Sequence, residues 1–268
     1  MSTDVGLLPI EERGWRRGLD NLLRGELSAW FASSRWWKHL LVWLLVIDLM
    51  LLFVITAPAP EDGGAGPDVL FLYGVFGGLF VAIGTMVVMQ RVIVGEKTSG
   101  SAAWVLSKPV TRPAFVVSRL LVNGLGIAVT AVVVPALVFY ILVGALSSIG
   151  WLPPLGYLAG VVLLVVHVLF WATLTWTMGS FSNSNAAVIA VPLATFFGLW
   201  HLPQFIPGLV HVSPLTLALG EEDAGVPGLA ASLMNGDAPN SWLPLVSALV
   251  LIVVFVAAGI LRFDREEF

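Results

Sequence analysis

The sequence of 268 residues contains no cysteine and few charged residues. The absence of cysteine excludes structural disulfides and thiolate metal sites, and it leaves the redox state of the compartment undetermined. Charged residues make up 11% of the chain, against about 25% in an average soluble protein. Hydrophobic residues make up 58%. A soluble domain of this size would lack the polar surface to cover itself, so the composition predicts an integral membrane protein.

Long apolar runs divide the chain into candidate spans. A bilayer-spanning helix needs roughly 20 predominantly apolar residues, and six runs reach that length. They lie at about 39–57, 69–90, 117–145, 155–179, 186–203 and 242–261. We therefore expect an all-α membrane protein with six transmembrane helices over residues 39–268. No cleavable signal peptide is expected, because the first 38 residues lack a continuous apolar region.

Lysine and arginine are confined to one side of this arrangement. All 13 precede the first run, lie between or at the border of the second and third runs, or follow the sixth. The opposite side carries acidic residues only: Glu61, Asp62, Asp68, Glu221, Glu222, Asp223 and Asp237. The positive-inside rule then predicts a multi-pass protein of the cell (inner) membrane with both termini in the cytoplasm. No nucleic-acid partner is expected.

Residues 1–38 are interpreted as a cytosolic tail with an interfacial helix. Cations alternate there with apolar residues at helical spacing: Leu19, Leu22, Leu23, Leu27, Trp30 and Phe31. This pattern is typical of helices that lie in the interface plane of the lipid bilayer. Trp30, Trp36 and Trp37 fit an aromatic belt at the headgroups. A solvated amphipathic tail is the alternative.

The outer segment 204–241 contains two short apolar stretches, "GLVHVSPLTLALG" and "GLAASLMNG". Both are too short to span a bilayer and too apolar for a solvated loop. Non-helical backbone at membrane depth must be buried in protein. We expect short re-entrant helices here, between the fifth and sixth spans.

The cytosolic loop 91–114 contains the stretch "GEKTSGSAAWVLSKPVTRP". Gly95, Ser99 and Gly100 are expected to end the second span. Ser101 would then cap a short helix over residues 102–108, which Pro109 ends, and Thr111 would cap the third span with Pro113 in its first turn. This loop cannot build its own core around Trp104. The exposed apolar helix predicts a docking site for another protein.

These residues resemble a known family. The pattern Glu-Lys-x-x-Gly, a small apolar helix and "LSKPVTRPAFVVSRLL" is similar to the cytosolic signature of ABC-2 type transporter permeases. The family has six spans, an amphipathic elbow helix before the first span, and re-entrant helices between the fifth and sixth. The residues that match the signature are Glu96, Lys97, Gly100, Leu106, Ser107, Pro109, Val110 and Arg112.

The resemblance implies a function and partners. In the family, this loop is a coupling helix that contacts a separate ABC ATPase subunit, and two permease copies pair around a central path. Trp104 joins the matching residues as an expected contact with the ATPase. The chain would be the permease subunit of an exporter and not an enzyme. ATP and Mg²⁺ would bind to the partner, and no cofactor is expected here. The string "GEKTS" at Gly95 lacks the pattern of a phosphate-binding loop.

Two alternative functions remain open on the sequence. One is a secondary transporter, which would use an ionisable group at the membrane midplane such as Asp48. The other is an ABC complex that does mechanical work and moves no small cargo. Intramembrane proteolysis is disfavoured, because the "EERGWR" string at Glu11 lies in the polar tail. The spacing of the four histidines gives no metal site.

Three polar residues inside spans are candidates for either the path or packing. Asp48 should face the bundle, either protonated or hydrogen-bonded to groups such as Asn123 or Thr175, because a charged side chain at mid-span costs about 2.5–3.5 kcal/mol. His167 is expected to be a neutral histidine that is hydrogen-bonded within the bundle. Small-residue stripes at 74–82 and 156–160 indicate close helix approach, either in the dimer or within one chain.

Overall fold

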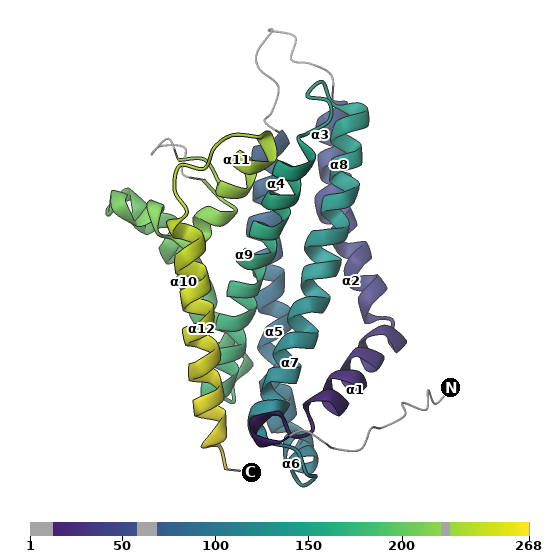
Figure 1. Cartoon of the computed structure of the whole chain (residues 1–268), viewed down its shortest axis with the longest axis vertical. Helices are drawn as coiled ribbons and strands as arrows, with labels where there is room; N and C mark the ends of the chain where they lie inside the picture. The colour runs from purple at the N-terminus through teal and green to yellow at the C-terminus, as the bar shows by residue number, and fades with distance from the viewer. Residues whose placement is uncertain (1–12, 58–68, 221–225, 268) are drawn as a thin grey trace.

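The computed structural model describes residues 13–57, 69–220 and 226–267. These residues are helical or irregular, with no β-strand among them. Six helices are long and apolar enough to cross a membrane (Figure 1): Arg35–Thr56, Val69–Thr98, Arg112–Leu146, Pro154–Phe181, Asn185–Gln204 and Leu243–Asp264. The predicted all-helical class and number of spans are confirmed, and the chain has the architecture of a multi-pass membrane protein.

Each of the first three spans contains a π-helical segment. The first comprises α2 (Arg35–Trp43), η2 (Leu44–Leu49) and α3 (Met50–Thr56). The second comprises α4 (Val69–Gly74), η3 (Val75–Phe80) and α5 (Val81–Thr98). The third comprises α7 (Arg112–Ile127), η4 (Ala128–Val133) and α8 (Val134–Leu146). π-Helical turns are rare and occur frequently at functional sites, so their gathering in three neighbouring spans bears on function.

The other spans are α9 (Pro154–Phe181), α10 (Asn185–His201) with the 3₁₀ turn η5 (Leu202–Gln204), and α12 (Leu243–Asp264). The helix α9 lies at the centre and packs against α5, α7, α10 and α12. Its large aromatic side chains Trp171 and Trp176 are fully buried. Trp176 donates its indole N–H to the backbone carbonyl of Val116 on α7, at 3.1 Å. A buried indole needs such a partner, so this bond fixes α9 against α7.

One end of the bundle carries the N-terminal helix, the short loop helix and the end of α12. The N-terminal part comprises η1 (Gly14–Arg16) and α1 (Leu19–Ala32), the loop helix is α6 (Ser101–Leu106), and the neighbouring ends of α2, α5 and α7 lie at the same end. In Figure 1 they lie at the lower end, where α1 runs obliquely beside α7. We call it the basic end, because every lysine and arginine of the chain falls in the segments that meet there. The opposite end, with no such residue in 39–90 or 120–261, is called the cation-free end.

The loop predicted at 91–114 is shorter than expected. The helix α5 continues through Gly95 to Thr98, and α7 begins at Arg112. A single glycine costs a helix about 1 kcal/mol, which is too little to end one that is otherwise well packed. The loop therefore spans residues 99–111 only.

The capping prediction was wrong at Ser101 and right at Thr111. Gly100, in the left-handed region at φ 74°, precedes α6, and Ser101 is the first helical residue. A residue with a side chain would be strained at that φ, so the sequence needs glycine there. The helix α6 ends at Leu106, before the predicted residue 108. The Thr111 hydroxyl accepts the N–H of Ala114 at 3.3 Å, and Pro113 lies in the first turn of α7.

The segment between α10 and α12 folds back onto the bundle. It contains the 3₁₀ turns η6 (Pro207–His211) and η7 (Pro214–Leu217), and the helix α11 (Leu229–Asn235). A Cβ atom added to Gly78 would lie 2.6 Å from the Cβ of Ala218, and one added to Gly156 would lie 2.2 Å from the carbonyl oxygen of Leu233. The small residues at 74–82 and 156–160 thus allow this segment to approach the spans closely, and their role is packing within one chain.

Candidate functional site

The loop helix α6 presents an uncovered aromatic side chain at the basic end. Ala102 is buried on the inner side of α6, which packs against α5. Trp104 lies on the outer side and is 68% exposed, with the Lys108 ammonium 5.2 Å from its ring centre. A hollow of about 340 Å³ opens beside it: Ala103, Leu106, Ser107, Val110 and Arg112. The loop therefore offers a tryptophan and an adjacent hollow, the kind of surface that a protein partner covers.

An ionic network lies directly behind this loop. The Arg119 guanidinium on α7 forms ion pairs with Glu96 on α5, at 3.0 Å, and with Glu26 on α1. Glu96 also accepts a hydrogen bond from the Ser101 hydroxyl at the start of α6. The Arg119 guanidinium lies 5.2 Å from the ring centre of Phe115, within the range of a cation–π contact. One arginine thus connects α1, α5 and α7, and Glu96 extends the connection to α6.

A second set of contacts joins the same region to the C-terminal helix. Lys97 on α5 pairs with Glu266 at 3.2 Å, and Glu266 pairs with Arg262 on α12 at 2.9 Å. Arg112, at the start of α7, donates to the backbone carbonyl of Asp264. The ends of α5, α7 and α12 are therefore held together by charged groups.

The chain just before α1 is bonded to the far side of the loop. The Thr111 N–H donates to the Arg17 carbonyl at 3.1 Å, and the Thr111 hydroxyl donates to the Trp15 carbonyl at 2.5 Å. Gly18 precedes α1 with φ 83°, and a Cβ atom there would lie 2.7 Å from the Val110 side chain. Glycine is required by both the backbone conformation and the close approach.

The structure gathers all the residues that matched the signature and separates them from the residues inside the spans. The matching residues Glu96, Lys97, Gly100, Leu106, Ser107, Pro109, Val110 and Arg112, together with Trp104, all lie in or next to the loop. A glutamate at the edge of a docking loop can pair with a basic group of the partner or hold the loop in place. The basic partner of Glu96, Arg119, lies in its own chain.

Sequence reasoning missed Glu26, Arg119 and Glu266 as parts of this site. The signature itself contains Arg119, within "VVSRLL", but no pattern of spacing connects it to Glu26 or Glu96. The only signal for Glu26 in the sequence was its position on the polar face of the amphipathic segment.

Of the two alternatives for Asp48, the structure does not contain the hydrogen bonds to Asn123 or Thr175. Asn123 donates to the Arg119 carbonyl at 2.8 Å, and the Thr175 hydroxyl donates to the Trp171 carbonyl at 2.8 Å. The Asp48 side chain is buried as expected, with 4% exposure. Neither carboxyl oxygen has a hydrogen-bond partner among the described residues. The cost of a charge at mid-span predicted that the acid faces the bundle, but it could not specify the neighbours of the carboxyl group.

The prediction of a hydrogen-bonded His167 is confirmed. Its Nε2 atom accepts the indole N–H of Trp171 at 3.2 Å, which leaves Nδ1 to donate to the carbonyl of Pro214 at 3.3 Å. An imidazole with one accepting and one donating nitrogen is neutral. His167 stands halfway along the 28 residues of α9. The segment at Pro214 therefore reaches the middle of the central helix.

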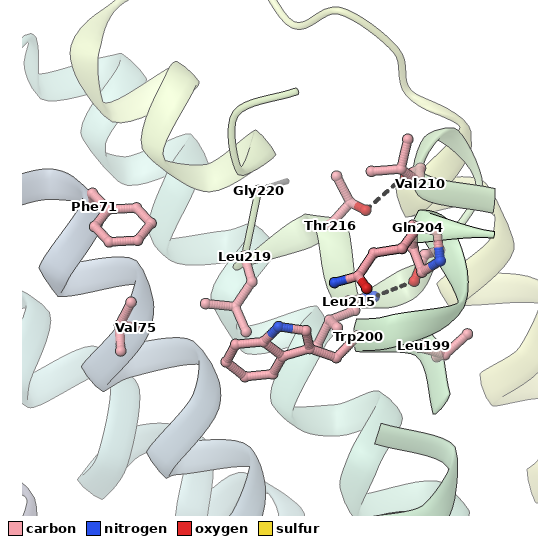
Figure 2. Close-up of a pocket in the computed structure, with 12 residues that line it drawn as sticks. Phe71, Val75, Leu199, Trp200, Gln204, Val210, Leu215, Thr216, Leu219 and Gly220 are labelled. Carbon is pink, nitrogen blue, oxygen red and sulfur yellow. Dashed lines mark hydrogen bonds between the residues drawn. The ribbon is translucent and has the colours of Figure 1, made fainter. Parts of the chain in front are cut away.

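A second candidate region lies toward the cation-free end, between α4, η3 and α10 (Figure 2). A hollow of about 290 Å³ is lined mainly by apolar side chains, among them Phe71, Leu199 and Leu219. In Figure 2 the Gln204 amide lies beside the Trp200 ring, and Thr216 donates its hydroxyl to the Val210 carbonyl at 2.7 Å. An apolar hollow with few polar groups suits an apolar or amphipathic ligand.

Comparison with protein-family models gives no match, and comparison with curated proteins gives none either. Within the described ranges, no three histidine, aspartate or glutamate side chains gather where a metal ion could bind.

Proposed function

We propose that this chain is the permease subunit of an ABC-2 type exporter, in which two copies associate with two ATPase subunits. The observation that carries the proposal is the helix α6. This helix presents an exposed tryptophan at the basic end, in the loop that contains the signature residues. The ion pairs of Arg119 attach it to the spans through Glu96. A coupling element needs both properties: a surface that a partner holds, and firm attachment to the spans that must move.

The contacts behind α6 give a route for that movement. The hydrogen bond from Ser101 to Glu96 connects α6 to α5. The ion pairs of Arg119 with Glu96 and Glu26 then connect α5 to α7 and α1. Arg112 and Lys97 connect the same helices to the end of α12. The helices α5, α7 and α12 all pack on α9. Closure of the ATPases would displace α6, and these spans would follow it and switch the path between inward and outward access.

The proposal places the basic end in the cytoplasm, in agreement with the positive-inside rule. The helix α1 acts as the elbow at the membrane interface. Its exposed side chains Leu27 and Phe31 suit the lipid boundary, whereas Trp30 is buried against Gly126 of α7. The segment 207–217 is re-entrant from the outer side. The bond between His167 and Pro214, halfway along α9, supports that depth.

The cargo class follows from the hollow near Trp200. Its lining of apolar side chains with a single amide and a few hydroxyl groups favours a lipid-like or amphipathic cargo over a highly charged ion. The path and the lever belong to this chain, and the chemistry of ATP hydrolysis belongs to the partner.

The test is co-purification of an ABC ATPase with the wild-type chain from its native membranes, followed by the association of Trp104 variants with that ATPase. Truncating a buried aromatic anchor at an interface costs about 2 kcal/mol or more, and about 1.4 kcal/mol is one decade in affinity. Trp104→Ala should therefore weaken association at least tenfold. Trp151→Ala is the matched control, since Trp151 is 62% exposed but lies between α8 and α9, far along the chain from α6. Wild-type affinity in both variants would refute the proposed docking.

A further inference from the structure

Asp48 is the one acidic residue in the six spans that lies far from a helix end. It is 4% exposed, and both its oxygens are buried without a hydrogen-bond partner in the part of the chain that the structure describes. No lysine or arginine occurs in residues 39–90 or 120–261. The surrounding half of the bundle thus supplies no permanent positive charge to pair with this carboxyl group.

Two tyrosines lie near Asp48, and one histidine, His39, lies in the same span. Tyr73 on α4 and Tyr157 on α9 lie close enough to interact electrostatically with Asp48. Tyr157 donates its hydroxyl to the Ala136 carbonyl at 2.5 Å, and Tyr140 on α8 donates to the Leu152 carbonyl at 3.2 Å. The segments η3 and η4 contribute no titratable side chain.

The histidine, His39 on α2, is engaged elsewhere. Its Nε2 atom accepts the indole N–H of Trp43 at 3.1 Å, and its Nδ1 atom is 2.6 Å from the Thr130 hydroxyl on η4. An imidazole that accepts at Nε2 and donates at Nδ1 is neutral. His39 therefore provides no positive charge for Asp48 either.

Irregular helix geometry surrounds the same acid. Asp48 lies within the π-helical segment η2, which packs against η3 and α8. The segment η3 begins two residues after Tyr73, and η4 ends three residues before Ala136. π-Helical turns inside α-helices occur frequently at functional sites. Two such turns, η2 and η3, pack against each other at one unpaired carboxyl group, and they give a second observation, independent of its burial.

An ionised carboxylate in this position would be costly. Placing a charge at the centre of a span costs about 2.5–3.5 kcal/mol on insertion scales, and here no protein group offsets that cost. Only a cation from outside the protein can neutralise it. Small metal cations need about six oxygen ligands. This site offers one carboxylate, and the hydroxyl of Tyr157 already donates to a carbonyl. A proton needs no further ligand.

We propose that Asp48 is a proton-binding site inside the bundle, which holds an exchangeable proton at neutral pH and carries no metal ion. The proton binds to one carboxyl oxygen and is exchanged with water, so the site takes up or releases one positive charge. The proposal does not rest on the exporter function. It would hold equally for a secondary transporter, in which such a group couples transport to protons.

Infrared spectroscopy of the purified protein in lipid vesicles tests this directly. At neutral pH the wild-type protein should show the C=O stretch of a protonated carboxylic acid, and that band should shift in D₂O. Asp48→Asn should remove the band. Asp237→Asn, at an exposed aspartate, is the matched control and should retain it.

Two further measurements cover a variant that fails to fold. Wild-type protein with ¹³C-labelled aspartate carboxyl groups should show the same band at lower frequency, without any mutation. Thermal unfolding of the wild-type protein should be unchanged when NaCl or KCl replaces choline chloride at equal ionic strength. A wild-type spectrum without an isotope-sensitive band would overturn the proposal. Stabilisation by Na⁺ or K⁺ that Asp48→Asn abolishes would overturn it in favour of a metal site.

Discussion

Removal of Arg119 is the sharpest test of the ionic network, because Glu26 and Glu96 both depend on it. Exposed ion pairs contribute about 0–1 kcal/mol, whereas breaking a buried pair by removing one partner costs about 3–5 kcal/mol. The side chains of Arg119, Glu26 and Glu96 are 14%, 22% and 21% exposed, so this network is intermediate between an exposed ion pair and a buried one. We therefore expect Arg119→Met to lower the free energy of unfolding by about 2 kcal/mol, roughly 30-fold in the equilibrium constant.

The expected loss arises mainly from the two carboxylates that remain without a cation. Neutralising them should restore stability, because a buried ionic group replaced as a whole by neutral groups is often tolerated. The triple variant Glu26→Gln, Glu96→Gln, Arg119→Met should thus recover more than half of the loss. Equilibrium unfolding in mixed detergent micelles measures both quantities. The control is Arg91→Met on α5, an exposed arginine without an ion pair among the described residues.

Two outcomes would refute this reasoning. If Arg91→Met lost as much stability as Arg119→Met, the loss would reflect general charge or packing and not the network. If the triple variant were as unstable as Arg119→Met alone, unpaired carboxylates would not be the cause.

Two further predictions concern packing and topology. Gly78→Ala should destabilise the protein by about 1–3 kcal/mol, since its Cβ would lie 2.6 Å from that of Ala218. Gly95→Ala, in the same span with open space around it, should be neutral or stabilising in the same unfolding assay; equal effects would contradict the docking of the outer segment. In this cysteine-free chain, Ser107→Cys should react with a membrane-impermeant maleimide only from the cytoplasm, and Asp237→Cys only from outside. Reaction of both from one side would exclude the six-span topology.

The spans could be predicted from the sequence because length and hydrophobicity alone decide whether a helix crosses a bilayer. Their ends could not. The helix α5 runs past Gln90 to Thr98 because its last turns pack against α6 and α7, and polarity does not report such packing. The π-helical segments were missed for a related reason: they depend on how neighbouring spans fit together.

The parts of the candidate site that depend on residues close together in the sequence could be predicted. The contacts between residues far apart in the sequence could not. The loop, the exposed Trp104 and the cap at Thr111 follow from residues within a few positions of one another. The pairing of Arg119 with Glu26 and Glu96 joins three helices, and only their packing reveals it. Asp48 shows the same limit, because an almost uniformly apolar span does not indicate which neighbours a side chain faces.

The central claim is that α6 docks on an ATPase subunit. A photo-crosslinking amino acid at position 104, in the chain expressed together with the ABC ATPase that co-purifies with it, tests that contact most directly. Illumination in native membranes should give a crosslinked product of this chain with the ATPase, and the same probe at position 151 should give none. Crosslinks from position 104 to lipid alone, in membranes where the ATPase is present, would contradict the account.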